Sequence, residues 1–222
     1  MQALLEPLRP LLTPAFTAGG VAFTWLEMAA FVMGVAMVLC NLRVSVWGWP
    51  LAIGSSLAYA LLFADGRLYG QAALQGVFIV ISVWGWWRWR SAPAAHSGRR
   101  GIGDLTARQR WVAAAATLVC WAAMAEALRR AGGADTAGLD ALTTAASLTA
   151  QALLALKRRE TWPLWLAVNV LSVGLFSMQG LWLTALLYAV FAVLSVLGWR
   201  AWREAVGTPT VAPSEGALKD RS

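Results

Sequence analysis

Charged residues are scarce in this sequence. Only 13% of the 222 residues are Asp, Glu, Lys or Arg, whereas 59% are hydrophobic and the mean hydropathy is +0.60. A soluble domain usually carries about 25% charged residues, because its surface faces water. The shortage excludes an ordinary water-soluble globular protein and predicts an all-α polytopic membrane protein whose helices contact membrane lipid.

Cysteine and histidine are nearly absent as well. The two cysteines, Cys40 and Cys120, lie within apolar runs, and the single histidine, His96, lies in a polar loop. This distribution argues against a disulfide framework, a metal cluster and a Ser-His-Asp set, and no phosphate-cradling glycine loop is found. We therefore expect no enzyme activity, no catalytic residues, no metal and no cofactor.

The apolar residues gather in seven runs, each about as long as a membrane span. The runs cover about residues 21–41, 46–63, 68–87, 111–128, 139–156, 157–178 and 181–202. The chain is thus expected to consist of an N-terminal interfacial segment (1–20), a first three-helix unit (21–90), a cytoplasmic loop (91–110), a single linker helix (111–130), a second three-helix unit (139–203) and a disordered cytoplasmic tail (204–222).

The net charge of +7 could suggest a nucleic-acid partner, but the basic residues lie in short segments between the apolar runs. There they set membrane topology, and we expect no nucleic-acid binding. With seven spans, fourteen of the basic residues fall on one side of the membrane and four on the other. The positive-inside rule then predicts a multi-pass protein of the cell (inner) membrane with its N-terminus outside and its C-terminus in the cytoplasm.

An internal repeat relates the two halves. Shifting the chain by 113 residues aligns Trp49-Pro50-Leu51 with Trp162-Pro163-Leu164 without a gap. The same shift superposes Ser82, Gly85, Trp86, Trp89 and Arg90 on Ser195, Gly198, Trp199, Trp202 and Arg203. Each pair of matching spans is four crossings apart, so both three-helix units run in the same direction. Parallel repeats are a transporter design, although a repeat can also be purely architectural.

Polar side chains inside the spans are costly unless they face the protein interior. Trp162, Trp165 and Asn169 lie at helical spacings of three and four, so they share one face that could hold a flat polar molecule. They could equally serve only to pack helices. The other candidates are Gln75, Gln151, Asn41 at the end of the first span, Tyr188, and Trp49 as the first-half counterpart of Trp162. Carboxamides offer hydrogen bonds without charge, which favours amide and hydroxyl recognition over ion conduction.

Several of these segments resemble the PnuC family of nicotinamide riboside transporters. The first half does so through Trp-Pro-Leu-Ala-Ile at 49–53, Leu74-Gln75 and Gly-Trp-Trp-Arg-Trp at 85–89. The second half does so through Ser-Leu-Thr-Ala-Gln-Ala-Leu-Leu at 147–154, the set Lys157, Glu160, Trp162, Trp165 and Asn169, and Leu-Trp-Leu-Thr-Ala-Leu-Leu-Tyr at 181–188. The resemblance implies a three-plus-one-plus-three arrangement like that of a SWEET sugar transporter, a homotrimer, and facilitated diffusion followed by cytoplasmic phosphorylation of the substrate.

The resemblance also implies roles for the candidate residues. Trp162 and Trp165 would border the aromatic ring, Asn169 and Gln151 would hydrogen-bond its polar groups, and Gln75 and Tyr188 would complete the site. Many family members carry an asparagine in the second span where this chain reads Gly54-Ser55-Ser56. Thiamine or another B vitamin therefore stays an alternative substrate, and a membrane scaffold without transport stays an alternative of another class.

Overall fold

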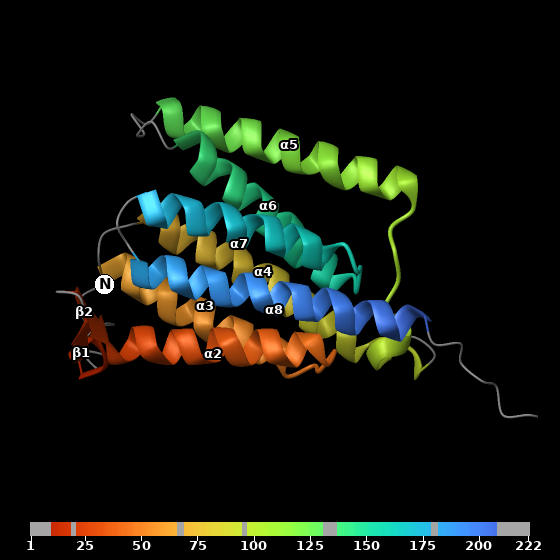
Figure 1. The fold of residues 1–222 in the computed structure, drawn as a ribbon, viewed down its shortest axis with the longest axis horizontal. Coiled ribbons are helices and arrows are strands. Elements are labelled where there is room, and N and C mark those ends of the chain that lie inside the picture. Colours follow the sequence, from red (N-terminus) through yellow and green to blue (C-terminus); the bar gives the residue numbers. More distant parts are fainter. Residues whose placement is uncertain are drawn as a thin grey trace, which may run out of the picture.

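The computed structural model describes residues 10–18, 21–65, 69–94, 97–130, 137–178 and 182–207. These residues form a two-stranded antiparallel hairpin and seven helices that lie side by side (Figure 1). The elements are β1 Pro14–Ala18, β2 Val21–Thr24, α2 Trp25–Leu42, α3 Gly48–Asp65, α4 Tyr69–Arg90, α5 Ala107–Arg130, α6 Ala137–Ala155, α7 Thr161–Met178 and α8 Trp182–Gly207, with a 3₁₀ turn, η3, at Gly98–Gly101. His96 and the part of the predicted tail at 208–222 lie outside the described residues.

The first helix begins four residues later than its apolar run. Residues 21–24 pair with β1, and α2 starts only at Trp25. Thr24 caps this start, because its hydroxyl accepts the amide of Glu27 while the Glu27 carboxylate accepts the amide of Thr24. The chain is mostly helical, and the all-α expectation is wrong at this hairpin, which includes residues 14–18 of the predicted interfacial segment.

By length and composition, four of the described helical segments could cross a membrane. They are Trp25–Leu42, Ala107–Arg130, Thr161–Met178 and Ala185–Val206. The remaining helices α3, α4 and α6 carry Gly, Ser, Thr or Gln among their apolar residues, and each packs on other helices of the bundle. For these three helices, the predicted membrane spans stay a prediction.

The two halves repeat each other at the ends of α2 and α6. Val44 and Lys157, which are 113 residues apart, both have a positive φ, of 55° and 53°. In each turn the next residue's N–H donates to the carbonyl five residues earlier, at 2.9 Å. This is the hydrogen bond of a Schellman cap, formed here without the usual glycine. A left-handed conformation is rare for a β-branched residue, so the surrounding packing must hold Val44 in it.

Four tryptophans from the two halves form the largest core cluster, close to these turns. Trp49 meets Trp89 edge to face, with ring centroids 5.3 Å apart, and Trp162 meets Trp202 in the same way at 5.5 Å. All four are at least 96% buried. Edge-to-face pairs are worth about 0.5–1.5 kcal/mol beyond the burial of their area, so this cluster anchors one end of the bundle.

Glycines make room for the rings. A Cβ placed on Gly85 would overlap the ring of Trp49, and one placed on Gly198 would overlap the ring of Trp162. The helices α4 and α8 therefore bring their backbones against tryptophans of α3 and α7 in the same manner. The Gly-Trp pattern seen in both halves of the sequence is thus a packing requirement.

The halves are also joined to each other by indole hydrogen bonds. Trp89 of α4 donates its Nε1–H to the carbonyl of Ala155 at the end of α6, and Trp202 of α8 donates to the carbonyl of Asn41 at the end of α2, both at 3.1 Å. Each half thus contacts the other through an equivalent pair of helices: α4 packs on α6, and α2 packs on α8.

A polar segment closes this end of the bundle. The Glu160 carboxylate accepts the amide of Leu105 at 2.9 Å and pairs with Arg110 at 3.0 Å, while Arg159 pairs with Asp104 at 2.8 Å. The end of α4, the turn between α6 and α7 and the end of α8 lie together, opposite the hairpin (Figure 1). Most of the basic residues that the structure describes therefore lie at this end of the molecule.

Candidate functional site

A cavity of about 220 Å³ lies between α2, α6, α7 and α8. Three helices of the second half and one of the first contribute its walls. The lining residues are Met37, Val38 and Asn41 from α2, Gln151 and Leu154 from α6, Trp162, Trp165 and Asn169 from α7, and Tyr188, Phe191 and Ser195 from α8.

Six of the eight residues proposed from the sequence line this cavity: Asn41, Gln151, Trp162, Trp165, Asn169 and Tyr188. The other two lie elsewhere. Gln75 is half-buried on α4 and does not line the cavity, and Trp49 is buried in the tryptophan cluster against Trp89. The spacing of Trp162, Trp165 and Asn169 does place them on one face, because all three reach the same cavity.

Serine hydroxyls position two of the three buried carboxamides that line the cavity, those of Asn169 and Gln151. Asn169 donates from Nδ2 to Oγ of Ser195 at 3.2 Å, and Ser195 donates in turn to the carbonyl of Phe191 at 2.8 Å. Gln151 donates from Nε2 to Oγ of Ser82 at 3.3 Å, so its amide links α6 to α4 of the other half. In both cases the amide nitrogen is engaged, and the side-chain orientation is fixed before a ligand arrives.

Two lining residues carry buried polar atoms that have no hydrogen-bond partner among the described residues: Oδ1 of Asn41 and Nε1 of Trp162. Leaving a buried polar group unpaired costs about 1–3 kcal/mol, and such groups usually mark a place where water or a ligand completes the bonding. Gly48 lies against the amide of Asn41, and a Cβ there would overlap Oδ1. Asn41 and Trp162 thus each bring one unpaired polar atom to the residues that line the cavity, and Nε1 of Trp49 is unpaired in the same way outside it.

Aromatic rings line much of the remaining wall. Tyr188 stacks on Phe176, with centroids 5.2 Å apart and planes 17° from parallel, and meets Phe191 edge to face at 6.4 Å. Trp162 and Trp165 add two indoles from α7. Aromatic faces attract flat rings and cations, and the interaction with a cation strengthens where water is excluded.

The described lining residues are apolar, aromatic or neutral polar. Among them there is no carboxylate, lysine, arginine or histidine, and Tyr188 alone is ionisable. Within the part of the chain that the structure describes, no group of three His, Cys, Asp or Glu side chains could hold a metal. The arrangement can hold a flat, polar or cationic small molecule by stacking and by neutral hydrogen bonds.

Sequence reasoning did not select five of the lining residues: Met37, Val38, Leu154, Phe191 and Ser195. The first four are ordinary apolar residues of apolar helices, so no local signal distinguishes them. Ser195 could have been found, because the repeat aligns it with Ser82, and each of these serines accepts a hydrogen bond from a buried carboxamide.

Comparison with known proteins gives consistent matches over most of the chain. A family profile described as Nicotinamide mononucleotide transporter matches residues 24–204. The nicotinamide riboside transporter PnuC of Neisseria mucosa is 28% identical over 82% of this chain and 73% of its own length. The riboflavin/roseoflavin transporter RibM of Streptomyces davaonensis is 26% identical over 80% of this chain and 84% of its own.

A solved structure is similar as well. The crystal structure of the vitamin B3 transporter PnuC superposes with a TM-score of 0.67 at 27% identity, covering 82% of each chain.

Proposed function

The chain belongs to the nicotinamide mononucleotide transporter family, and on this basis we propose that it carries nicotinamide riboside across the cell membrane by facilitated diffusion. The observation that carries the proposal is the aromatic and carboxamide cavity between α2, α6, α7 and α8. Its unpaired acceptor and donor and its neutral lining fit an uncoupled carrier of an aromatic cation.

Each part of nicotinamide riboside has a matching group in the cavity. The pyridinium ring is flat and cationic, and the faces of Trp162, Trp165 and Tyr188 would contribute about 1–2 kcal/mol by cation–π attraction in a dry pocket. The carboxamide or ribose hydroxyls would donate to Oδ1 of Asn41 and accept from Nε1 of Trp162. Both buried atoms would then be satisfied.

The proposal includes the architecture expected for such a carrier. The units α2–α4 and α6–α8 act as parallel repeats of seven membrane spans in a SWEET-like three-plus-one-plus-three arrangement, with α5 as the linker. The N-terminus faces outward in the inner membrane and the basic end faces the cytoplasm. The matching turns at Val44 and Lys157 and the gathering of basic residues at one end support this assignment.

Two further features are proposed from the family resemblance. The carrier works as a homotrimer, for which α5, with no buried residue, offers a free apolar surface. Uptake is made one-way because the substrate is phosphorylated in the cytoplasm, so no coupling ion is needed.

The experiment that tests the function is calorimetric titration of the purified protein with nicotinamide riboside. We expect micromolar binding, weakened about 3- to 10-fold or more by Asn169→Ala, because a hydrogen bond at the ligand is worth about 0.5–1.5 kcal/mol. Gln75→Ala is the matched control, since it removes a half-buried amide that does not line the cavity. Equal weakening in both variants would refute the proposed site.

Riboflavin is a second candidate substrate, favoured by the similarity to RibM. Competition for uptake into proteoliposomes separates the candidates, with riboflavin and thiamine each added in excess over labelled nicotinamide riboside. We expect neither to compete strongly. Transport of riboflavin or thiamine alone would keep the carrier and change its substrate, and absence of flux for all three would favour a scaffold without transport.

A further inference from the structure

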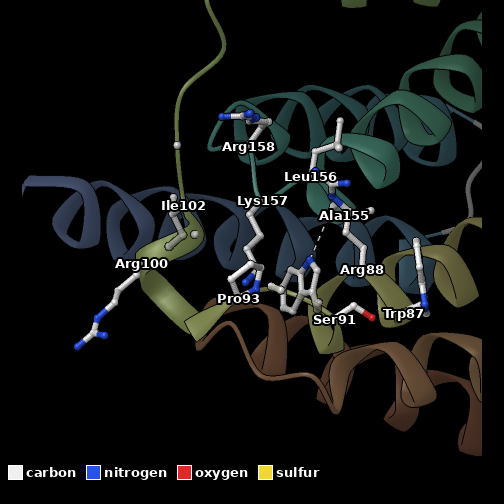
Figure 2. A pocket seen from close by; sticks show the side chains of 14 residues that line it. Trp87, Arg88, Ser91, Pro93, Arg100, Ile102, Ala155, Leu156, Lys157 and Arg158 are labelled. Atoms are coloured by element: carbon white, nitrogen blue, oxygen red, sulfur yellow. Dashed lines mark hydrogen bonds between the residues drawn. The ribbon is translucent and has the colours of Figure 1, made fainter. Parts of the chain in front are cut away.

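Neutral side chains line the substrate cavity, among the residues that the structure describes. The cationic side chains of Arg88, Arg100, Lys157 and Arg158 line a different cavity, of about 630 Å³, at the basic end of the bundle (Figure 2). Selection of a ligand in the substrate cavity therefore depends on shape and on the direction in which neutral hydrogen-bonding groups are held.

Ser195 determines which end of the Asn169 amide it holds. A serine hydroxyl has one proton to donate, and Ser195 donates it to the carbonyl of Phe191 at 2.8 Å. The hydroxyl oxygen can then offer Asn169 only a lone pair, which an N–H group can use and a carbonyl oxygen cannot. The contact of 3.2 Å between Oγ and the amide therefore fixes Nδ2, and not Oδ1, on the side of Ser195.

The carbonyl oxygen of Asn169 is the end of the amide that remains for a ligand. Asn169 is buried and lines the cavity, and within the described part of the chain its Oδ1 accepts no hydrogen bond. This oxygen is not fully enclosed by protein, in contrast to Oδ1 of Asn41. An unfilled acceptor is costly in a buried site, so a ligand with an N–H or O–H donor is favoured over one without.

Ser82 and Gln151 repeat this arrangement across the interface between the halves. The shift of 113 residues aligns Ser82 with Ser195, and both serines are buried. Nε2 of Gln151 donates to Oγ of Ser82 at 3.3 Å, so Oε1 is again the end of the amide that remains for a ligand. Two carboxamides that line the cavity thus have their nitrogens engaged and their carbonyl oxygens available.

We propose that Ser195 is a positioning residue that makes Asn169 a hydrogen-bond acceptor, so that the cavity selects substrates with an N–H or O–H donor over substrates with a carboxylate. Ser82 supports the same polarity through Gln151. The carbonyl oxygens carry partial negative charge, so they also favour a cationic ligand. A carboxylate would bring its own oxygens against them without a proton to share.

This role of Ser195 rests on the proposed function, because it is defined by the carboxamide of nicotinamide riboside, which carries two N–H donors. Nicotinic acid riboside has the same ring and ribose, but at neutral pH a carboxylate stands in place of the carboxamide. The two compounds therefore differ only in the group that Asn169 would read.

The test compares the affinities of these two ribosides. Purified full-length protein is titrated calorimetrically with nicotinamide riboside at neutral pH, and the Kd for nicotinic acid riboside is obtained by displacement. The test variant is Ser195→Ala, in which Nδ2 of Asn169 loses its acceptor and the amide is free to turn either end to the ligand. Ser195→Cys is a second test variant that keeps the side-chain volume and replaces the hydroxyl by a weakly hydrogen-bonding thiol.

Ser147→Ala is the matched control. Ser147 makes the same bond to a carbonyl four residues earlier, that of Thr143 at 2.7 Å, and does not line the cavity. The variant therefore removes an equivalent hydroxyl without changing the hold on Asn169.

We expect the wild type and Ser147→Ala to bind the carboxamide at least about tenfold more tightly than the carboxylate. In Ser195→Ala this preference should fall at least about threefold, and Ser195→Cys should change it in the same direction. The ratio of the two Kd values is the decisive readout, because a loosened cavity weakens both ribosides alike and a smaller folded fraction changes neither Kd.

Three results would overturn this role of Ser195: an unchanged ratio in both test variants, an equal fall of the ratio in Ser147→Ala, or a wild type without preference for the carboxamide. Each of them leaves the proposed function standing, since the wild type still binds nicotinamide riboside. A wild type that binds neither riboside would overturn both.

Discussion

The substitution Gly198→Ala tests whether the packing of α8 on α7 sets the shape of the substrate cavity. The new Cβ would overlap the ring of Trp162, which is buried and lines the cavity. Overpacking a buried site costs about 1–3 kcal/mol, and displacing Trp162 also loses an edge-to-face pair worth about 0.5–1.5 kcal/mol.

A matched alanine isolates this cost from helix propensity. Gly174 has open space around its Cβ position, so Gly174→Ala gains the same propensity, about 1 kcal/mol, without overlap. The two variants should therefore differ by about 2–4 kcal/mol in the free energy of unfolding. In a thermal unfolding assay of the purified protein, this corresponds to a Tm difference on the order of 10 °C.

Gly85→Ala separates stability from binding. It produces the same overlap on Trp49, which lies outside the cavity, so we expect a similar loss of Tm with the Kd for nicotinamide riboside unchanged within about twofold. Gly198→Ala should lower Tm and also weaken binding. If Gly198→Ala instead matched Gly174→Ala in both Tm and Kd, the argument from close packing would be wrong.

Three further substitutions probe other contacts. Thr24→Ala removes the capping box of α2 and should cost about 1 kcal/mol, seen as faster amide exchange at residues 25–28; unchanged exchange would contradict the capping role. Glu160→Gln should speed amide exchange at Leu105 and its neighbours, because the variant loses the carboxylate that binds Leu105 and Arg110. Protection equal to that of the wild type would contradict this role of Glu160. Tyr188→Phe keeps the stack on Phe176 and should preserve substrate Kd within about threefold, whereas Tyr188→Ala should weaken it about tenfold; equal losses would point to the hydroxyl.

Much of the cavity could be predicted because polar groups are conspicuous in apolar helices. Asn169, Gln151 and Asn41 interrupt runs that are otherwise suited to lipid, and burying a carboxamide is favourable only where it finds partners. The structure places all three at one cavity. The seven apolar runs also predicted seven helices in the order in which the structure shows them along the chain.

The sequence could not predict whether an individual residue points toward the cavity or away from it. Gln75 lies on a helix that is apolar on most sides, so no amphipathic stripe indicates which side is the interior. Trp49 and Trp162 are both followed by Pro-Leu and both meet another tryptophan edge to face, yet of the two only Trp162 lines the cavity. The internal repeat predicts equivalent packing for the two tryptophans, so it cannot show beside which of them a cavity forms.

The hairpin was missed for a different reason. The prolines and paired glycines of residues 1–20 indicate a break in helix, but strand pairing depends on a partner segment. That partner, Val21–Thr24, continues directly into the apolar run of α2. The Thr24-x-x-Glu27 pattern was a visible sign that the helix starts later.

The reciprocal indole bonds constrain how the two halves can move. Separating the halves at the basic end would break the Trp89 and Trp202 bonds together, at about 0.5–1.5 kcal/mol each, and would expose the tryptophan cluster. A rocking motion of the two halves about the basic end would leave these hydrogen bonds in place. The cluster would then act as a pivot, and Asn41 contacts it through its backbone carbonyl while also lining the cavity. We therefore expect a tilt of one half about this end to move Asn41, and with it one wall of the cavity.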